Sequence, residues 1–210
     1  MVMLNNNLMI KTLIVGNMFT NCYIVYDKMK GKAFIIDPGA EADNIKKYLD
    51  SNKLNVEFII HTHGHIDHII ADAQFEIPIY IHKLDREYLL NSEFNLSSFL
   101  DSPFKLANKD IRALNDGDKV EFIDSTLKII HTPGHTPGGI CILLNKALFS
   151  GDTLFAEGIG RTDFPGASHE LLVDSIKEKL LKLPDDVVVY PGHGEPTTIG
   201  REKKTNPFLM

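Results

Sequence analysis

The chain has few cysteines, no long apolar run and no excess of basic residues. Its 210 residues include 2 cysteines, and 28 acidic residues stand against 22 lysines and arginines, giving a formal net charge of -6. Without a basic cluster to neutralise phosphates, no nucleic-acid partner is expected. No run of about eighteen apolar residues occurs, and residues 1–10 lack a basic start and a long apolar core, so neither membrane spanning nor export is expected. We therefore expect a cytoplasmic protein.

The composition predicts a globular chain with its cysteines in the core. Hydrophobic residues make up 43% of the chain and charged residues 24%, which is ordinary for a chain that buries a substantial core. Cys22 and Cys141 lie in apolar runs and are not spaced as a zinc-binding pair, so we expect two buried thiols and no disulfide. No linker or low-complexity segment interrupts the chain, and a single domain over residues 1–210 is expected.

Apolar runs and turn residues follow the same order in both halves of the chain. The expected strands are residues 8–15, 21–26, 32–37, 56–60 and 79–82, then 120–123, 127–131, 140–144, 147–150 and 187–190. The expected helices are residues 42–49 and 168–183, the second capped by Ser168 with Leu171 on its apolar stripe, and one beginning near Lys83. Residues 91–111 read as a polar loop with one helical turn. Each strand set has helices on one side only, which suggests two sheets packed face to face with helices outside.

The segment after the expected strand 56–60 is dense in metal-ligand side chains. Four of them fall within six residues, namely His63, His65, Asp67 and His68. Strand-end loops are where α/β folds commonly build their sites. Gly64 lets the backbone bend between two imidazoles, and Asp67 is expected to open a helix that runs to Ala73.

Three other strand-end loops each carry one metal-binding side chain, namely His135, Asp152 and His193. Prolines and glycines beside them fix the turns and strip bulk from beside the ligands. A single tetrahedral zinc needs four ligands, or three and a water, so five histidines and two carboxylates indicate two metals that share a carboxylate. Asp152 is the natural bridge.

These residues stand in the order and rough spacing of the metallo-β-lactamase-fold hydrolases, and the chain resembles the glyoxalase II-like (hydroxyacylglutathione hydrolase-like) branch over nearly its whole length. Residues 160–165 and the tail from Thr198 to Pro207 are similar to that branch as well. The resemblance implies an α/β (α+β) fold, a four-layer αββα sandwich of two mixed β-sheets with helices outside. It also implies one metal at His63, His65 and His135, and a second at Asp67, His68 and His193, with Asp152 and a hydroxide bridging.

Two adjacent dications create a nucleophile at neutral pH, because zinc lowers the pKa of bound water towards about 7. We therefore expect two zinc ions, with iron or manganese as other possible metals, and attack of a metal-bridging hydroxide on a thioester. Asp67 would aim this attack as the catalytic residue. The first-choice substrate is the small molecule S-lactoylglutathione or another hydroxyacylglutathione. Glyoxalase II proper continues into a helical region that helps hold glutathione, whereas this chain stops at Met210, so a compact relative is expected.

Other activities stay open. The persulfide dioxygenase resembles the chain in the same ligand set, and its single iron would use His63, His135 and Asp152, a two-histidine, one-carboxylate face. A lactonase or another hydrolase of the fold is a further alternative. A binding module with closed coordination is disfavoured, because structural zinc sites use four ligands and are usually rich in cysteine. A β-lactamase and a nuclease are disfavoured by the missing export signal and the acidic balance.

Two residues are candidate substrate contacts. His82 stands at a strand end from which it could reach the rim of the site, although a lone histidine is more often structural. Arg161 either meets a substrate carboxylate or pins its own loop through Asp163, because a loop arginine beside an aspartate is commonly a structural pair. The oligomeric state does not follow from the sequence.

Overall fold

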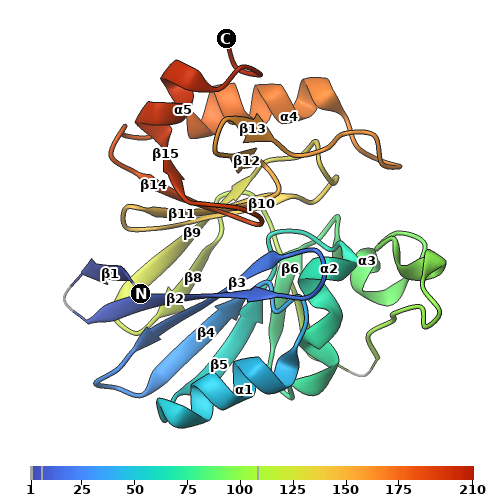
Figure 1. Ribbon diagram of the computed structural model, residues 1–210, viewed down its shortest axis with the longest axis vertical. Helices are drawn as coiled ribbons and strands as arrows, with labels where there is room; N and C mark the ends of the chain where they lie inside the picture. The colour runs from blue at the N-terminus through green and yellow to red at the C-terminus, as the bar shows by residue number, and fades with distance from the viewer. Residues whose placement is uncertain (1, 6, 108) are drawn as a thin grey trace. The chain divides into compact units, whose positions relative to one another are not determined.

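The structure is a computed structural model that describes residues 2–5, 7–107 and 109–210. The chain divides into two compact units. Unit 1 spans Met1–Ile81 and Arg86–Ala113, and unit 2 spans His82–Asp85 and Leu114–Met210 (Figure 1). That the two units make up one domain stays a prediction.

Unit 1 is built on a seven-stranded mixed sheet in the order β1-β2-β3-β4-β5-β6-β7. The strands are β1 (Val2–Asn5), β2 (Leu8–Val15), β3 (Thr20–Asp27), β4 (Lys32–Ile36), β5 (Asn55–Ile60), β6 (Ile79–His82) and β7 (Ile111–Leu114). Strands β1 to β4 pair antiparallel, whereas β4, β5 and β6 run parallel. The parallel register sets Ile36 opposite Ile60, so the residues that follow β4 and β5 emerge at the same edge.

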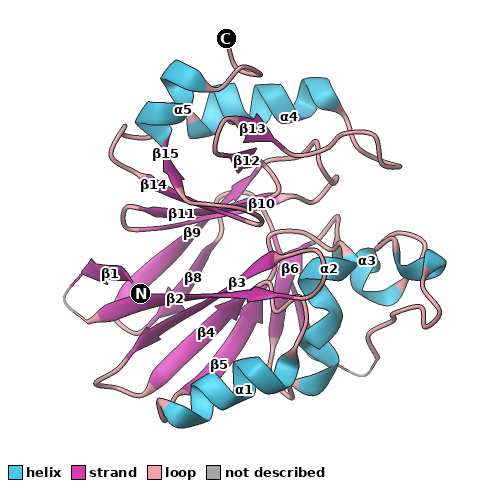
Figure 2. Ribbon diagram, in the orientation of Figure 1, coloured by secondary structure: helices cyan, strands magenta, loops and turns pink. Residues whose placement is uncertain are grey.

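Helices cover unit 1 by burying short apolar stripes. They are α1 (Ala42–Ser51), α2 (Ile66–Ile69), α3 (Arg86–Leu90) and the 3-10 turns η1 (Ile70–Gln74) and η2 (Ser97–Phe99), drawn in Figure 2. Ile45 and Leu49, four residues apart on α1, pack into the core that contains Ile35 and Ile59 of the sheet. The single turn predicted in the long loop is confirmed by η2.

The predicted continuous helix after Asp67 is wrong. It stops after Ile69 and continues as the 3-10 turn η1. In an α-helix the Ala71 N–H would bond to the carbonyl of Asp67, but it donates to the carbonyl of Pro38 at 3.1 Å instead. The turn after β4 thus takes over a hydrogen bond that the helix needed.

Unit 2 is built on a six-stranded mixed sheet in the order β15-β14-β11-β10-β9-β8. A separate two-stranded sheet of β12 and β13 lies between β11 and β14 in the sequence. The strands are β8 (Lys119–Phe122), β9 (Ser125–His131), β10 (Ile140–Leu144), β11 (Ala147–Gly151), β12 (Leu154–Phe155), β13 (Gly158–Ile159), β14 (Val188–Pro191) and β15 (Thr197–Thr198). Strands β11 and β14 are parallel, and the other pairs are antiparallel. The site loops after β11 and β14 therefore leave the same edge.

The helices of unit 2 are α4 (His169–Ser175), the π-helical turn η3 (Ile176–Leu180) and α5 (Ile199–Thr205). The predicted cap is confirmed, since Ser168 Oγ accepts the Leu171 N–H at 3.3 Å. Leu172, Ile176 and Leu180 pack against Leu148 and Val189 of the sheet. The prediction that Leu171 lies on this stripe is wrong: it is 52% exposed, because the buried residues recur every four positions from Leu172.

The fold class predicted from the sequence, two mixed sheets with flanking helices, is confirmed. Most predicted strands are present within a residue or two, whereas β1, β7, β12, β13, β15 and α5 were not predicted. Cys22 and Cys141 are buried thiols without a disulfide, and burial raises the pKa of Cys141 to about 11. Within the described part of the chain, no helix is long and apolar enough to cross a membrane.

Candidate metal centre

The loop between β5 and α2 gathers four predicted ligands within unit 1. His63, His65 and His68 are each at most 5% exposed. The ring centroid of His63 lies 4.8 Å from that of His65 and 4.1 Å from that of His68. Asp67 Oδ2 lies 3.3 Å from His68 Nε2. Nitrogen and oxygen donors thus converge at the end of β5 as the sequence predicted.

A buried carboxylate that the sequence analysis read only as a turn residue organises this loop. Asp37 accepts the Thr62 N–H at 2.9 Å and the Thr62 hydroxyl at 2.5 Å, and its Oδ2 lies 3.0 Å from His68 Nδ1. Burial by itself would raise the pKa of Asp37, but the adjacent His68 and His61 hold that pKa well below its usual range. Metal-binding histidines commonly donate their second ring N–H to a carboxylate. Asp37 is placed to accept this hydrogen bond from His68 Nδ1, which turns His68 Nε2 towards Asp67.

The hydrogen-bonded chain continues away from the ligands through two further buried groups. His61 Nδ1 lies 3.3 Å from Asp37 Oδ1, and His61 Nε2 lies 2.8 Å from Asp72 Oδ2. Both His61 and Asp72 are fully buried. Burial would lower the pKa of His61, but the carboxylates of Asp72 and Asp37 raise it to about 9. A protonated His61 between two carboxylates balances charge that would otherwise be costly to bury.

Asp67 is positioned by the strand and turn beside it. Its Oδ2 accepts the Thr20 hydroxyl at 3.0 Å. The backbone packs even more closely: a Cβ added to Gly39 would stand 1.8 Å from the carbonyl oxygen of Asp67. Only glycine fits in the turn after β4 while α2 keeps this position.

In unit 2 the three remaining predicted ligands lie together at strand ends. Asp152 Oδ2 is 3.6 Å from His135 Nε2 and also 3.6 Å from His193 Nε2. A separation of 3.6 Å is too long for a hydrogen bond. One carboxylate oxygen facing two imidazole nitrogens at equal distance is the arrangement expected of a carboxylate that shares metals with both histidines. The side chains of Asp152 and His193 keep 14% and 27% exposure.

The ligands of unit 2 are supported mainly by backbone atoms. His135 Nδ1 donates to the carbonyl of Arg161 at 2.7 Å, which again orients Nε2 for a metal. A Cβ on Gly160 would stand 1.8 Å from the carbonyl oxygen of Asp152. Buried Asp85 braces the His135 loop by accepting the Thr136 hydroxyl and the Gly138 N–H, both at 2.6 Å.

The two candidate substrate residues have partners of other kinds. His82 stacks on His131, with ring centroids 4.1 Å apart and planes 14° apart. The guanidinium of Arg161 pairs with Asp163 at 3.0 and 2.7 Å and lies 4.5 Å from the centroid of the Phe164 ring. This ion pair is the one expected if Arg161 holds its own loop in place through Asp163. A substrate contact of either residue stays a prediction.

Sequence reasoning missed the residues that hold the ligands, namely Thr20, Asp37, His61, Asp72 and Asp85. The available signals were weak: an aspartate at the end of a buried strand, and a histidine and an aspartate flanking the 62–68 motif. The donor atoms of both clusters are imidazole nitrogens and carboxylate oxygens, a set that suits zinc, iron or manganese. The residues therefore fit a metal centre.

Comparisons with known proteins agree with this chemistry. The family described as "Metallo-beta-lactamase superfamily" matches residues 15–193. The hydroxyacylglutathione hydrolase GloC of Haemophilus influenzae is 39% identical over 196 residues, covering 90% of this chain and 92% of that protein.

Solved structures also match this chain over most of its length. The crystal structure of BLEG-1 B3 metallo-β-lactamase has a TM-score of 0.91 and 39% identity, covering 96% of this chain and 100% of that one. The crystal structure of TTHA1623 in a di-iron-bound form has a TM-score of 0.81 and 30% identity, covering 95% of this chain and 100% of that one. With its two mixed sheets, flanking helices and clustered histidines and aspartates, the chain belongs to the metallo-β-lactamase superfamily.

Proposed function

We propose that this protein is a binuclear metal-dependent hydrolase of thioesters, with S-lactoylglutathione or another hydroxyacylglutathione as substrate. The observation that carries the proposal is the pair of histidine and aspartate clusters, one in each unit, which together offer seven metal ligands. The relative named hydroxyacylglutathione hydrolase supports the choice of substrate. A compact chain that aligns with 92% of that relative supports the same activity.

The ligands divide as the family resemblance implies. His63, His65 and His135 would hold one metal, and Asp67, His68 and His193 the other, with Asp152 shared. When bound, the two ions supply Lewis acidity and bring the pKa of a bound water towards about 7. Zinc is the first choice, and the di-iron form of TTHA1623 supports iron as an alternative.

The chain's own residues supply positioning and proton handling. Asp37 orients His68, and the Arg161 carbonyl orients His135, each by accepting a hydrogen bond from the histidine's Nδ1 atom. Asp67, whose Oδ2 accepts the Thr20 hydroxyl, would accept a hydrogen bond from the attacking water and aim it at the acyl carbon. The departing thiolate is a weak base, so the reaction needs little general-acid assistance.

The test is a metal analysis joined to a two-substrate assay on the purified protein. We expect about two metals per chain and hydrolysis of S-lactoylglutathione that chelation abolishes and zinc restores. A fully active preparation with a single iron, oxygen consumption on glutathione persulfide and no thioesterase activity would instead establish the dioxygenase alternative.

β-Lactam hydrolysis is a second candidate, favoured by the match to a structure titled as a B3 metallo-β-lactamase. Both reactions place a nucleophile on an acyl carbon, and they differ in whether sulfur or nitrogen leaves. Parallel assays on S-lactoylglutathione and a chromogenic cephalosporin decide between them. A higher kcat/KM on the cephalosporin would replace the thioesterase proposal.

A further inference from the structure

A hollow in unit 1 adjoins the proposed metal centre and is lined mostly by apolar side chains. It has a volume of about 430 Å³ and is bounded by Val15, Met18, Ile66, Ile70, Leu100 and the ligand Asp67, among others. Met18, Ile70 and Leu100 are 59%, 41% and 48% exposed. Ligand pockets commonly fall between about 300 and 1,000 Å³ and are mainly apolar, so the hollow has the size and lining of a small subsite.

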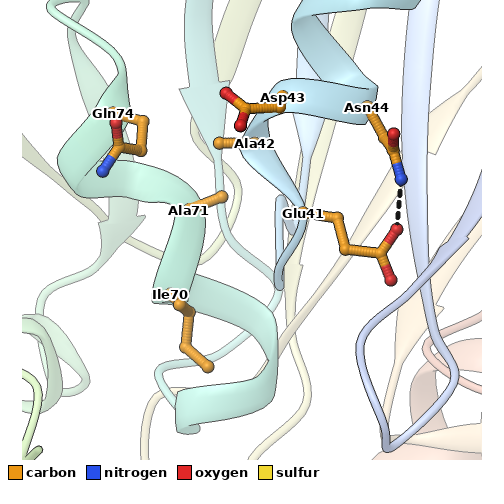
Figure 3. Close-up of a pocket in the computed structure, with 7 residues that line it drawn as sticks. All are labelled: Glu41, Ala42, Asp43, Asn44, Ile70, Ala71 and Gln74. Atoms are coloured by element: carbon orange, nitrogen blue, oxygen red, sulfur yellow. Dashed lines mark hydrogen bonds between the residues drawn. The ribbon is translucent and has the colours of Figure 1, made fainter.

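A neighbouring hollow lacks the apolar lining of the one beside Asp67. The neighbour, of about 530 Å³, shares Glu41 and Ile70 but is lined by Asp43, Asn44 and Gln74 (Figure 3). In Figure 3 the Ile70 side chain points away from Asp43 and Gln74. The neighbour includes none of the proposed ligands, and nothing in it indicates a partner.

The charges at the apolar hollow determine what could occupy it. Its lining includes the carboxylates of Glu41 and Asp67, and no lysine or arginine among the residues that the structure describes. Glu41 is fixed there because its side chain accepts the Gly16 N–H at 3.0 Å and the Asn44 side-chain N–H at 2.5 Å. A carboxylate of the substrate would lie near the Glu41 carboxylate, with no lysine or arginine in the lining to pair with it. An uncharged apolar group would gain by burial.

We infer that this hollow, termed the acyl pocket, binds an apolar acyl group of the thioester substrate. The inference rests on the proposed thioesterase function and adds a substrate class to it. Asp67 lies both in the proposed metal centre and in the wall of the pocket, so a thioester with its carbonyl at the metals has a substituent within reach of Ile66 and Ile70. The glutathione substituent carries carboxylates, so the acyl side is the one that fits. Met18, which is unbranched and adaptable, can pack against chains of different length.

The first experiment measures kcat/KM for acetyl, butyryl and hexanoyl thioesters of the same thiol. Burial of each added methylene predicts an increase of about two- to fourfold, mainly through KM. Met18→Ser and Leu100→Ser should each lower the ratio of hexanoyl to acetyl kcat/KM by at least about fivefold. Met29→Ser is the matched control, because Met29 is 82% exposed and lies outside the pocket. A ratio near one in the wild type, or equal loss in all three variants, would overturn the inference.

A variant that introduces a positive charge into the pocket sharpens the test. The wild type should prefer a hexanoyl thioester over one of equal length that ends in a carboxylate, and Met18→Lys should shift the preference towards the carboxylate by about tenfold or more. A wild type that prefers the carboxylate-terminated chain contradicts the charge argument.

Binding is followed separately from turnover by titrating the zinc-loaded protein with hexanoate and acetate while recording methionine methyl NMR signals. Hexanoate should shift the Met18 signal and leave the Met29 signal in place, and acetate should shift neither. If no thioester, including acetyl, is hydrolysed but hexanoate shifts Met18, the thioesterase function fails and the apolar pocket stands. If the Met18 signal responds to protein concentration and not to hexanoate, a second copy of the chain covers the surface and the inference is wrong.

Discussion

The two units hold their shares of the proposed metal centre by different means. In unit 1 the ligand loop is tied to a buried side-chain network, His68 to Asp37 to His61 to Asp72, all of it within 1% of complete burial. In unit 2, His135 is tied to a backbone carbonyl, and His193 and Asp152 keep partial exposure. Unit 1 therefore holds its ligands through a buried network of charged groups, which is strong when complete and costly when broken. Unit 2 relies more on backbone contacts, with buried Asp85 bracing the His135 loop.

The units also share one device. In each, a glycine stands where a Cβ would meet the carbonyl oxygen of a carboxylate ligand at 1.8 Å: Gly39 against Asp67, and Gly160 against Asp152. The backbone that carries each aspartate thus packs directly on a neighbouring turn. Side-chain support differs between the units, whereas the close backbone approach is common to both.

The largest expected effect comes from the residue assigned to both metals. Asp152→Asn keeps the shape of the side chain but weakens its metal binding, so kcat/KM should fall by more than about 100-fold and bound metal should fall with it, since even outer-sphere partners are worth about 10- to 100-fold. The measurements are thioester turnover and elemental analysis, with exposed His169→Gln as control. Normal metal content and turnover would remove Asp152 from the centre.

Alanine substitutions at the two glycines test whether close backbone packing matters equally in both units. Gly39→Ala and Gly160→Ala must each displace the carbonyl of an aspartate ligand, so both should lose metal and at least about 10-fold in kcat/KM, because small misplacements are costly in a preorganised site. Gly117→Ala is the control, since its added Cβ meets nothing within 4 Å although φ is +80°. It should cost only about 1–2 kcal/mol of stability. An effect at one glycine alone would show that one unit tolerates the shift.

The next comparison sets a buried carboxylate against an exposed one. Asp37→Asn leaves His61 and His68 without their shared anion, and breaking such a buried pair costs about 3–5 kcal/mol of unfolding free energy. Asp163→Asn breaks an exposed pair with Arg161, which water screens, so it should leave the unfolding free energy nearly unchanged. Urea unfolding of the metal-free proteins measures both. Equal effects would show that the unit 1 network adds no more stability than a surface pair.

The smallest effect concerns pH and lies in unit 2. Burial, followed by the neighbouring His131, lowers the pKa of His82 from 6.5 to about 4. The unfolded chain therefore binds more protons between these values, so the contribution of His82 to stability is complete above about pH 6.5 and is lost as the pH falls towards 4. His82→Gln should flatten the decline in urea midpoint across this window. Identical slopes for wild type and His82→Gln would contradict the lowered pKa.

Several features could be read directly from the sequence because they depend on neighbouring residues. The strands 79–82 and 140–144 were predicted at their observed bounds from local apolar patterns, and Ser168 was identified as a helix cap. Of the two roles left open for Arg161, the one that pairs it with Asp163, two residues away, has its ion pair in the structure. The Arg161 backbone carbonyl, which accepts the His135 Nδ1–H, does not involve the Arg161 side chain and so leaves no trace in residue type.

What the sequence by itself determined was the set of candidate ligand side chains, the strand-end loops that carry them and the fold class, since each follows from short spacings and alternating apolar residues. Only the tertiary structure decided what holds those ligands. Asp37 and Thr62 are 25 residues apart, and they meet because β4 and β5 pair in parallel with Ile36 opposite Ile60. The helix after Asp67 likewise ends early because a distant carbonyl, that of Pro38, takes the Ala71 N–H. Pairing register and competition for hydrogen bonds depend on the assembled sheet, so local sequence pattern could not reveal them.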